Sequence, residues 1–399
     1  MGLFGSRKDG PTVRGRIVTI PASGKAYIAS DLHGHQGDFA QLLRRTRIVD
    51  RIASGEDVYL IITGDVPDLE RHRAIDTAVK DDGDVAILDQ LIALEKELGE
   101  RSERIVYLEG NHDFHVVRIA REVACFDARR KNAPLPASDD FSDIDHAALA
   151  DYFVHYEKSF GPGVFTNNVT PYDMVHRVRA HHLEYLSRKP ILAVLEGAQT
   201  LVTHAGPPKM NGLSARALRR EIETASRDEL FESNAAAYYA SAYHQLLNNR
   251  FRARDYDLVD VDDFLKSFSC SLLVTGHTPH PYLVDYAKAS PLEGCGFRDG
   301  LGFVGGRQVV LCTSFGAFDA ARKRYIELDL TRAYNGTDDL RSGAEIQPLY
   351  PDAKPQDPSL DDTDQIIRAL ARQQAADGPR TGAYSRAAFK KDSPTIDKE

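Results

Sequence analysis

The chain has 399 residues, of which 42% are hydrophobic and 27% charged, a composition typical of globular proteins that bury a sizeable core. Its 50 basic and 59 acidic residues give a net charge of −9. This balance argues against nonspecific nucleic-acid binding, which requires clustered positive charge. The longest apolar runs are well short of the roughly 18 residues that a membrane span needs, so we expect no transmembrane segment.

The first third of the chain alternates short apolar runs with helical spacing. The pattern predicts strands at 16–20 and 25–29 around a turn, a helix at 38–52, a strand at 58–63, a helix at 85–98 and a strand at 104–108. This β-α-β-α-β order favours buried strands and right-handed crossovers. Polar motifs follow three of the strands directly, at the edge where open α/β sheets bind ligands.

Residues 114–190 show polar-rich helical spacing, and we expect them to form a helical insert or cap near that edge. The remaining expected elements are a hairpin at 191–196 and 200–203, helices at about 215–225 and 229–248, and strands at 271–275, 281–287, 308–313 and 324–330. Two sheets packed face to face, with helices outside, fit this order.

The two ends of the chain differ from the folded domain, which we expect to span residues 15–334. Residues 335–399 are polar and punctuated by proline, and predict a largely disordered tail outside the catalytic unit, with one short helix at 362–376. Residues 1–14 predict a flexible start. The opening MGLFGSRK lacks the apolar stretch of a signal peptide and matches an N-myristoylation pattern, although an unmodified start is the favoured interpretation.

The cysteines are widely spaced and fit no disulfide framework or zinc motif. We interpret all four as reduced thiols of a cytoplasmic protein: Cys125, Cys270, Cys295 and Cys312.

Five short segments carry chemically useful side chains. They read, in chain order, DLHGH, GDVPD, GNHD, THAG and GHTPH. Aspartate, histidine and asparagine from several strand ends are suitable ligands for divalent Mn, Fe or Zn. Asp31 and His33 are two residues apart, so in extended backbone both point the same way. Asp65 can give one carboxylate oxygen to each of two metals, which lie about 3.5–4 Å apart in two-metal hydrolases.

This ordered set resembles the calcineurin-like metallophosphoesterase superfamily over residues 27–315. The D-x-H-G form, the G-D-x-x-D form ending at Asp68, and THAGPP resemble its phosphoprotein phosphatase branch, which includes the diadenosine tetraphosphatases. The resemblance implies an α/β fold, a four-layer sandwich of two mixed β-sheets with helices outside. It also implies two metal sites that share one carboxylate, with the ligands Asp31, His33, Asp65, Asn111, His204 and His277.

By the same resemblance, His112 is the expected general acid for the leaving oxygen, and Asp68 is the carboxylate that orients its imidazole. A water or hydroxide bridging the metals would be the nucleophile and would attack in line. GHTPH has Pro279 where G-H-x-H relatives have a metal-binding histidine, so we expect His280 not to be a ligand. His35 is interpreted as a scaffold residue.

The phosphate-binding arginines depart from the family pattern, because Leu69 follows Asp68 where many relatives have arginine. The sequence leaves two groups of candidates, which are Arg71 or Arg73, and Arg250, Arg252 or Arg254.

We therefore expect a cytoplasmic dinuclear-metal phosphoesterase that hydrolyses phosphomonoesters, on a phosphoprotein or a small phosphorylated metabolite. A dinucleoside-polyphosphate hydrolase of the diadenosine tetraphosphatase type would share this site. An inactive metal-binding scaffold is the alternative from another class, and the intact pair Asn111-His112 argues against it.

Overall fold

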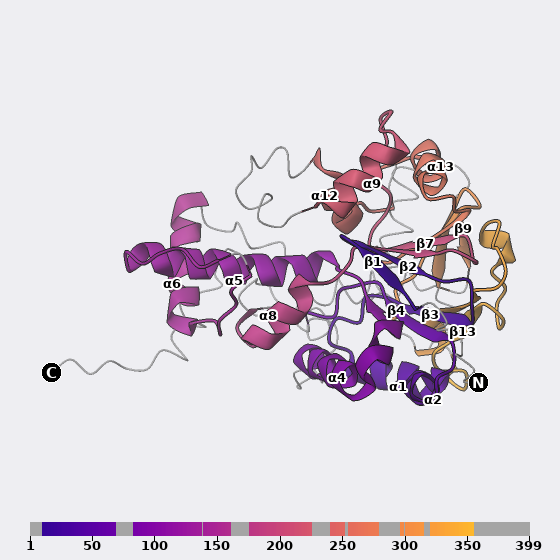
Figure 1. Ribbon diagram of the computed structural model, residues 1–399, viewed down its shortest axis with the longest axis horizontal. Coiled ribbons are helices and arrows are strands. Elements are labelled where there is room, and N and C mark those ends of the chain that lie inside the picture. Colours follow the sequence, from indigo (N-terminus) through magenta and orange to yellow (C-terminus); the bar gives the residue numbers. More distant parts are fainter. Residues whose placement is uncertain are drawn as a thin grey trace, which may run out of the picture.

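Two β-sheets packed face to face form the centre of the computed structural model, and helices cover both outer sides (Figure 1). The larger sheet has eight strands in the order β1-β2-β6-β7-β8-β11-β10-β9, and the smaller has five in the order β13-β12-β3-β4-β5. This is the four-layer arrangement that the resemblance implied. The structure describes residues 10–68, 83–137, 139–160, 175–225, 240–251, 254–278, 296–298, 300–314 and 320–354.

The larger sheet is mixed. Its parallel pairs are β2-β6, β7-β8 and β8-β11, and β6 and β7 form the expected hairpin. Three of its strands were not predicted from the sequence, namely β1, β9 and β10, and β1 lies within the expected flexible start. The strands are β1 (Thr12–Arg14), β2 (Ile17–Ile20), β6 (Leu192–Leu195), β7 (Thr200–Thr203), β8 (Leu272–Thr275), β9 (Gly296–Arg298), β10 (Leu301–Val304) and β11 (Gln308–Val310).

The smaller sheet contains the β-α-β-α-β unit, with β3, β4 and β5 parallel to one another. The C-terminal strands β12 and β13 add to it in antiparallel fashion. Although β2 and β3 are separated by only a short turn, they belong to different sheets. The strands are β3 (Lys25–Ala29), β4 (Val58–Ile62), β5 (Ile105–Tyr107), β12 (Arg324–Asp329) and β13 (Ile346–Pro348).

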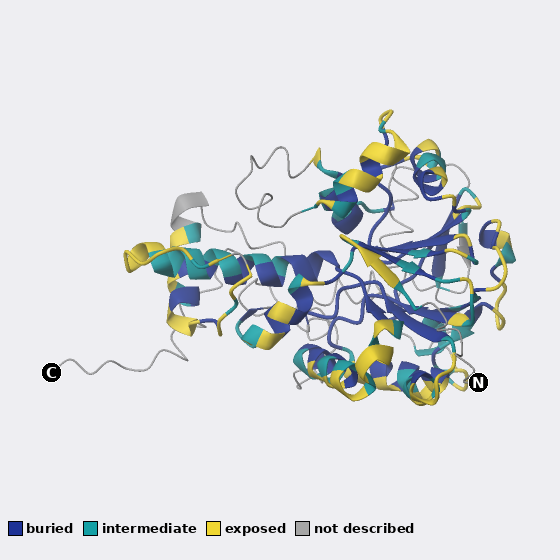
Figure 2. Cartoon of the chain, in the orientation of Figure 1, coloured by how far each residue is buried: buried dark blue, intermediate teal, exposed yellow. Residues whose placement is uncertain are grey.

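Both faces of the smaller sheet are buried, which explains its continuous apolar strands. On β4, Tyr59 and Ile61 face the larger sheet, whereas Val58, Leu60 and Ile62 face the outer helices, because successive side chains alternate along a strand. The outer face of the larger sheet packs on a separate group of helices. Figure 2 shows this buried double layer between exposed outer helix surfaces.

The helices on the smaller sheet's side are α1 (Gln36–Thr46), α2 (Ile48–Ser54), α4 (Gly83–Leu98), α5 (Asn111–Arg130), α6 (His146–Phe160) and α8 (Ala180–Ser187). Those on the larger sheet's side are α9 (Ala215–Glu223), α12 (Ala242–Asn248) and α13 (Leu258–Ser267). The single helix predicted at 38–52 is two helices, because Arg47 adopts a left-handed conformation with φ of 50°. No helix in the described ranges is long and apolar enough to cross a membrane.

The described part of the insert is helical, and α5 runs from the sheets toward α6, which lies beyond them (Figure 1). The part that would show whether the insert caps the site includes residues 161–174, which lie outside the described ranges. The expected strand at 281–287, most of the expected helix at 229–248 and the expected helix at 362–376 also lie outside them.

The expected domain boundary at residue 334 is too early. β13 pairs with β12, and the core includes Leu340, Ile346 and Leu349, whose side chains are fully or almost fully buried. A three-residue strand gives too short an alternation to stand out in the sequence. The folded unit therefore extends to about residue 350.

Candidate metal centre

The predicted ligands converge where strands from both sheets end. Asp31 and His33 follow β3, Asp65 follows β4, and His204 and His277 follow β7 and β8. Asn111 follows β5 as the first residue of α5. All six are buried, with at most 8% of any residue exposed.

Two glycines allow this close approach. A Cβ on Gly64 would lie 2.5 Å from the backbone nitrogen of Gly110, and a Cβ on Gly110 would lie 2.2 Å from Oδ1 of Asp65. Both distances are far inside normal contact, so only glycine lets the loops after β4 and β5 touch. Asp65 and Asn111 are thereby brought to one place.

The backbone at the site is also unusual. Ten non-glycine residues in the described ranges have positive φ, and five of them are predicted site residues: Asp31, His33, Asp65, Asp68 and His277. Such conformations are costly and persist where surrounding contacts enforce them, and they gather at functional sites.

Two overlapping groups of potential ligands share Asp65: one contains His33 and His112, the other His204 and His277. In the first, Nε2 of His33 lies 3.7 Å from Oδ2 of Asp65, and it lies 3.8 Å from Oδ1 of the neighbouring Asp31. In the second, Nε2 of His204 lies 3.4 Å from the same Asp65 oxygen, and 3.2 Å from Nδ1 of His277. This shared carboxylate is the arrangement that a dinuclear metal site requires.

Backbone carbonyls set the tautomer of all three histidines. Nδ1 of His33 lies 3.1 Å from the carbonyl of Pro67, Nδ1 of His204 lies 2.8 Å from that of Thr63, and Nε2 of His277 lies 3.1 Å from that of Asn248. A carbonyl only accepts, so these nitrogens carry the protons. The opposite nitrogens present lone pairs to the cluster, as metal ligands need.

The electrostatics fit a cation. Burial lowers the pKa of His204 to about 3 and that of His277 well below its usual value, so both imidazoles are neutral, the form that binds metals. Burial raises the pKa of Asp31 to about 6. Buried carboxylates among neutral imidazoles are costly unless a positive charge compensates them. The donor set therefore fits divalent metal ions.

Hydrogen bonds behind the ligands hold them in place. Both oxygens of Asp31 accept from the backbone N–H of His277, and Ser30 and the Cys312 thiol also donate to this carboxylate. Burial raises the pKa of that thiol, which keeps it protonated as a donor. The position of Cys312 in an apolar run gave no sign of this contact.

Asp113 closes the GNHD loop, a role that the sequence analysis missed. Its Oδ2 accepts from the backbone N–H groups of Asp65 at 3.0 Å and Gly110 at 2.7 Å, and its Oδ1 accepts from the Tyr107 hydroxyl at 2.5 Å. The available signal was its position three residues after the N-cap of a helix, where carboxylates bind free backbone N–H groups.

His112 belongs to the first group together with His33 and Asp65. Its Nδ1 is 3.0 Å from Oδ2 of Asp68, and its Nε2 is 3.8 Å from Oδ2 of Asp65. The ring therefore directs one nitrogen to a buried carboxylate and the other toward the cluster.

The profile of the calcineurin-like phosphoesterase family matches residues 24–281. The chain belongs to this family. No curated protein matches the chain in sequence.

Similar solved structures are distant from this phosphoesterase. A cold-active protein-tyrosine phosphatase of a Shewanella species is 17% identical, covers 78% of this chain and 77% of its own, and has a TM-score of 0.41. A protein serine/threonine phosphatase from Saccharomyces cerevisiae is 12% identical, with 77% and 73% covered and a TM-score of 0.36. A metallophosphoesterase from Sphaerobacter thermophilus is 13% identical, with 92% and 99% covered and a TM-score of 0.36.

Of the candidate arginines, the structure brings Arg250 to the phosphoesterase site. Its Nη1 donates to the carbonyl of His277 at 3.1 Å, and its charge contributes to the lowered pKa of His204 and His277. Arg254 points elsewhere, with 70% of its side chain exposed and Asp255 as its partner. The other candidate arginines and the residues that depart from the family pattern lie outside the described ranges: Arg71, Arg73, Arg252, Leu69, Pro279 and His280.

A third His/Asp group lies on α4 and α8, away from the family motifs. Nε2 of His182 is 2.8 Å and Nε2 of His181 is 3.3 Å from Oδ1 of Asp89. However, Nδ1 of His182 accepts from the backbone N–H of Arg179, so its Nε2 carries the proton and donates to Asp89. A protonated nitrogen cannot ligate a metal, so this group is a helix-capping network.

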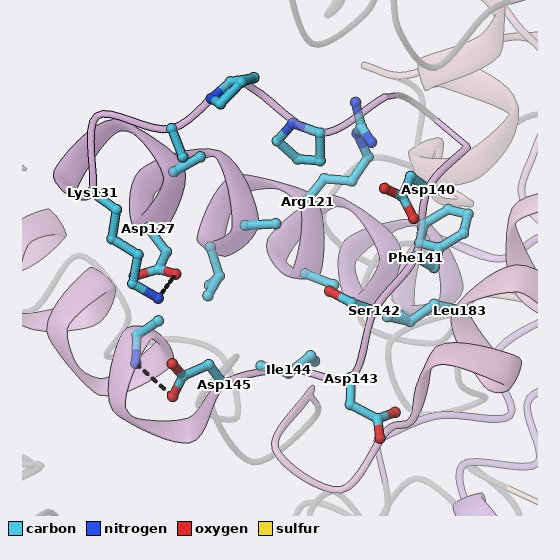
Figure 3. Close-up of a pocket in the computed structure, with 18 residues that line it drawn as sticks. Arg121, Asp127, Lys131, Asp140, Phe141, Ser142, Asp143, Ile144, Asp145 and Leu183 are labelled. Carbon is cyan, nitrogen blue, oxygen red and sulfur yellow. Dashed lines mark hydrogen bonds and ion pairs between the residues drawn. The ribbon is translucent and has the colours of Figure 1, made fainter.

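The insert also contains a cavity of about 270 Å³ between α5 and the segment 133–145 (Figure 3). Ala120, Ala124 and Ala128 lie along one face of α5 toward it, and the motif residues do not line it. It is therefore separate from the metal centre.

Proposed function

We propose that the chain is a dinuclear-metal phosphoesterase of the phosphoprotein phosphatase-like branch, and that it hydrolyses phosphomonoesters on a phosphoprotein or a small phosphorylated metabolite. The observation that carries the proposal is the pair His112 and Asp68 beside the shared ligand Asp65. A metal-binding scaffold needs ligands, but it has no use for an oriented acid next to them.

Two divalent ions, with Mn, Fe and Zn as the candidates, would be held by the six predicted ligands. Asp31, His33 and Asp65 would hold the first, and Asp65 would bridge to a second held by Asn111, His204 and His277. The ions would supply positive charge that stabilises the phosphoryl oxygens in the transition state and makes water a better nucleophile.

His112 would protonate the leaving oxygen. With its Nδ1 paired with Oδ2 of Asp68 at 3.0 Å, the protonated ring would carry its second proton on Nε2, which faces the cluster. Asp68 would favour this imidazolium and keep the ring from rotating. Transfer of the Nε2 proton to the leaving alkoxide would give an alcohol, and the Asp68 contact would then hold a neutral imidazole.

Arg250 would bind a non-bridging phosphate oxygen. Its guanidinium donates to the carbonyl of His277, so a predicted metal ligand would also position the arginine. Arginine suits this role because its planar donors match phosphate oxygens.

A cytoplasmic location forms part of the proposal. It is supported by the free thiols of Cys125, Cys270 and Cys312.

The test is a substrate panel with Mn-loaded protein: p-nitrophenyl phosphate, its bis ester, a serine phosphopeptide and diadenosine tetraphosphate. Preferred hydrolysis of the monoester and phosphopeptide supports the proposal. Preference for diadenosine tetraphosphate would identify a dinucleoside-polyphosphate hydrolase with the same site. Two bound ions without hydrolysis of any substrate would identify a scaffold.

A further inference from the structure

A buried carboxylate on α1 receives its partners from the far end of the chain. Asp38 is 1% exposed, and its Oδ2 accepts from Nζ of Lys323 at 2.5 Å, while its Oδ1 accepts from the Tyr350 hydroxyl at 2.8 Å. Lys323 precedes β12 and is itself buried, with 7% of its side chain exposed. Burial alone would raise the pKa of Asp38, but the charge of this lysine helps to lower it below its usual value.

This contact lies directly behind the first metal-binding motif. The backbone N–H of Asp38 donates to Nδ1 of His35 at 3.2 Å, and Nε2 of His35 lies 3.4 Å from Nζ of Lys323. His35 is two residues from the ligand His33, and Gly34 between them turns with φ of 75°. Asp38 and Lys323 therefore both contact the residue that ends the motif.

A second bond fastens the same helix. Nε2 of Gln41, one turn along α1, donates to the carbonyl of Leu349 at 2.8 Å. The start of α1 is thus tied to the segment around β13 by side-chain bonds. The 31–35 turn runs directly into that helix, because His35 is its N-cap residue, so the position of the turn depends on where the helix begins.

Stability alone explains this ion pair poorly. The free energy needed to take two charges out of water is about as large as the free energy gained from their attraction. Replacing a buried ion pair with apolar side chains of similar size therefore often leaves protein stability unchanged. Such a pair does, however, impose one geometry on the groups around it. An exposed pair that joins β3 to β12 provides the contrast: Lys25 and Glu327 lie 2.6 Å apart with 48% and 21% of their side chains exposed, and Lys25 begins β3 at the end away from the motif.

We propose that Asp38, Lys323 and Tyr350 are positioning residues of the metal centre. They hold the start of α1 and His35, and through them the turn that presents Asp31 and His33 to the first metal ion. The inference rests on the proposed dinuclear site and adds that the segment after residue 320 determines how tightly one of the two ions is bound.

The test compares metal affinity in variants that leave no buried charge unpaired. These are Tyr350→Phe and the double variant Asp38→Asn with Lys323→Met, and the matched control is Lys25→Met. Metal is removed with a chelator, Mn is titrated back, and the two dissociation constants are measured separately. Thermal unfolding in chelator reports stability without the ions.

We expect the double variant to lower the affinity for one of the two ions by about 10–100-fold, the usual effect of losing a hydrogen-bonding partner behind a metal ligand. Tyr350→Phe should give a smaller loss at the same ion, Lys323→Arg should retain most of the affinity, and Lys25→Met should bind both ions normally. If these residues had a purely structural role, the double variant would instead lower the unfolding temperature in chelator and reduce the affinity for both ions to the same extent.

Wild-type affinity for both ions in the double variant and in Tyr350→Phe would overturn the inference while leaving the proposed function intact. An equal loss of affinity for both ions would also overturn it. If the wild-type protein itself bound no metal, the proposed function and the inference would fall together.

Discussion

The carboxylate of Asp68 lies 3.0 Å from Nδ1 of His112, on the opposite side of the ring from Nε2, which lies 3.8 Å from the bridging candidate Asp65. Asp68 is 1% exposed and reaches this position with φ of 84°. A buried carboxylate held in a costly conformation against an imidazole orients that ring. In the proposed function this pair would supply the acid while other residues hold the metals, and substitutions can test the two roles separately.

His112→Ala should reduce kcat by about 10²–10⁴-fold on a phosphate ester with a poor leaving group, because the leaving oxygen loses its proton donor. The loss should be smaller on p-nitrophenyl phosphate, whose leaving group needs little protonation. Asp68→Asn should show the same trend more weakly. Steady-state kinetics with both esters, together with metal analysis, measure this. Equal losses on both esters would show that His112 does not protonate the leaving oxygen, and loss of metal would instead make it a ligand.

Asp65→Asn should reduce the occupancy of both metal sites, because Asp65 belongs to both ligand groups. His204→Ala should affect mainly one ion, since His204 belongs to the second group alone. Mass-spectrometric metal analysis of purified variants gives the number of ions per chain. His181→Ala is the matched control, and its metal content should equal that of the wild type. If His204→Ala emptied the site as fully as Asp65→Asn, the carboxylate would not be a bridge.

Metal affinity should weaken below about pH 6. Burial raises the pKa of Asp31 to about 6, so in the metal-free protein a proton competes for this carboxylate as the pH falls through that value. His204, with its pKa lowered to about 3, stays neutral over the same range and does not compete. Affinity should fall by up to about tenfold per pH unit below 6. Mn titrations at pH 7.5, 6.5 and 5.0 check this, and an affinity that already fell between pH 7.5 and 6.5 would contradict it.

A chain that stops after Lys354 should retain its fold, its metal ions and its activity on a small ester. A chain that stops after Thr337 should unfold or aggregate, because it loses β13 and three buried side chains, Leu340, Ile346 and Leu349. Each is worth about 1.5–3 kcal/mol, and together they approach the total stability of a typical domain. Circular dichroism and thermal unfolding of the two truncations check this. A folded, active chain ending at Thr337 would restore the shorter boundary expected from the sequence.

Much of the metal centre could be predicted because its signals are local. Asp31, His33 and Asp65 each follow an apolar strand, and Gly64 and Gly110 lie in the loops that approach each other closely. Strand ends gather at one edge of a sheet whatever the rest of the fold does. The hairpin of β6 and β7 was predictable for the same reason, since its two strands are neighbours in sequence.

The break at Arg47 and the strand β13 could not be predicted in this way. The apolar spacing of residues 38–52 continues through Arg47, so periodicity alone reads one helix where the backbone makes two. β13 is recognisable only through its partner β12, and its three residues contain no alternation long enough to identify it.

The sequence by itself determined which residues could bind metal and in what order they occur, because those choices depend on side-chain chemistry and on the local geometry of strand ends. Only the tertiary structure decided which nitrogen of His277 faces the cluster, that the Cys312 thiol supports Asp31, and that Lys323 and Tyr350 share Asp38. These contacts join residues far apart in the chain. They arise where two sheets and a returning C-terminal segment pack together, and no short stretch of sequence encodes such packing.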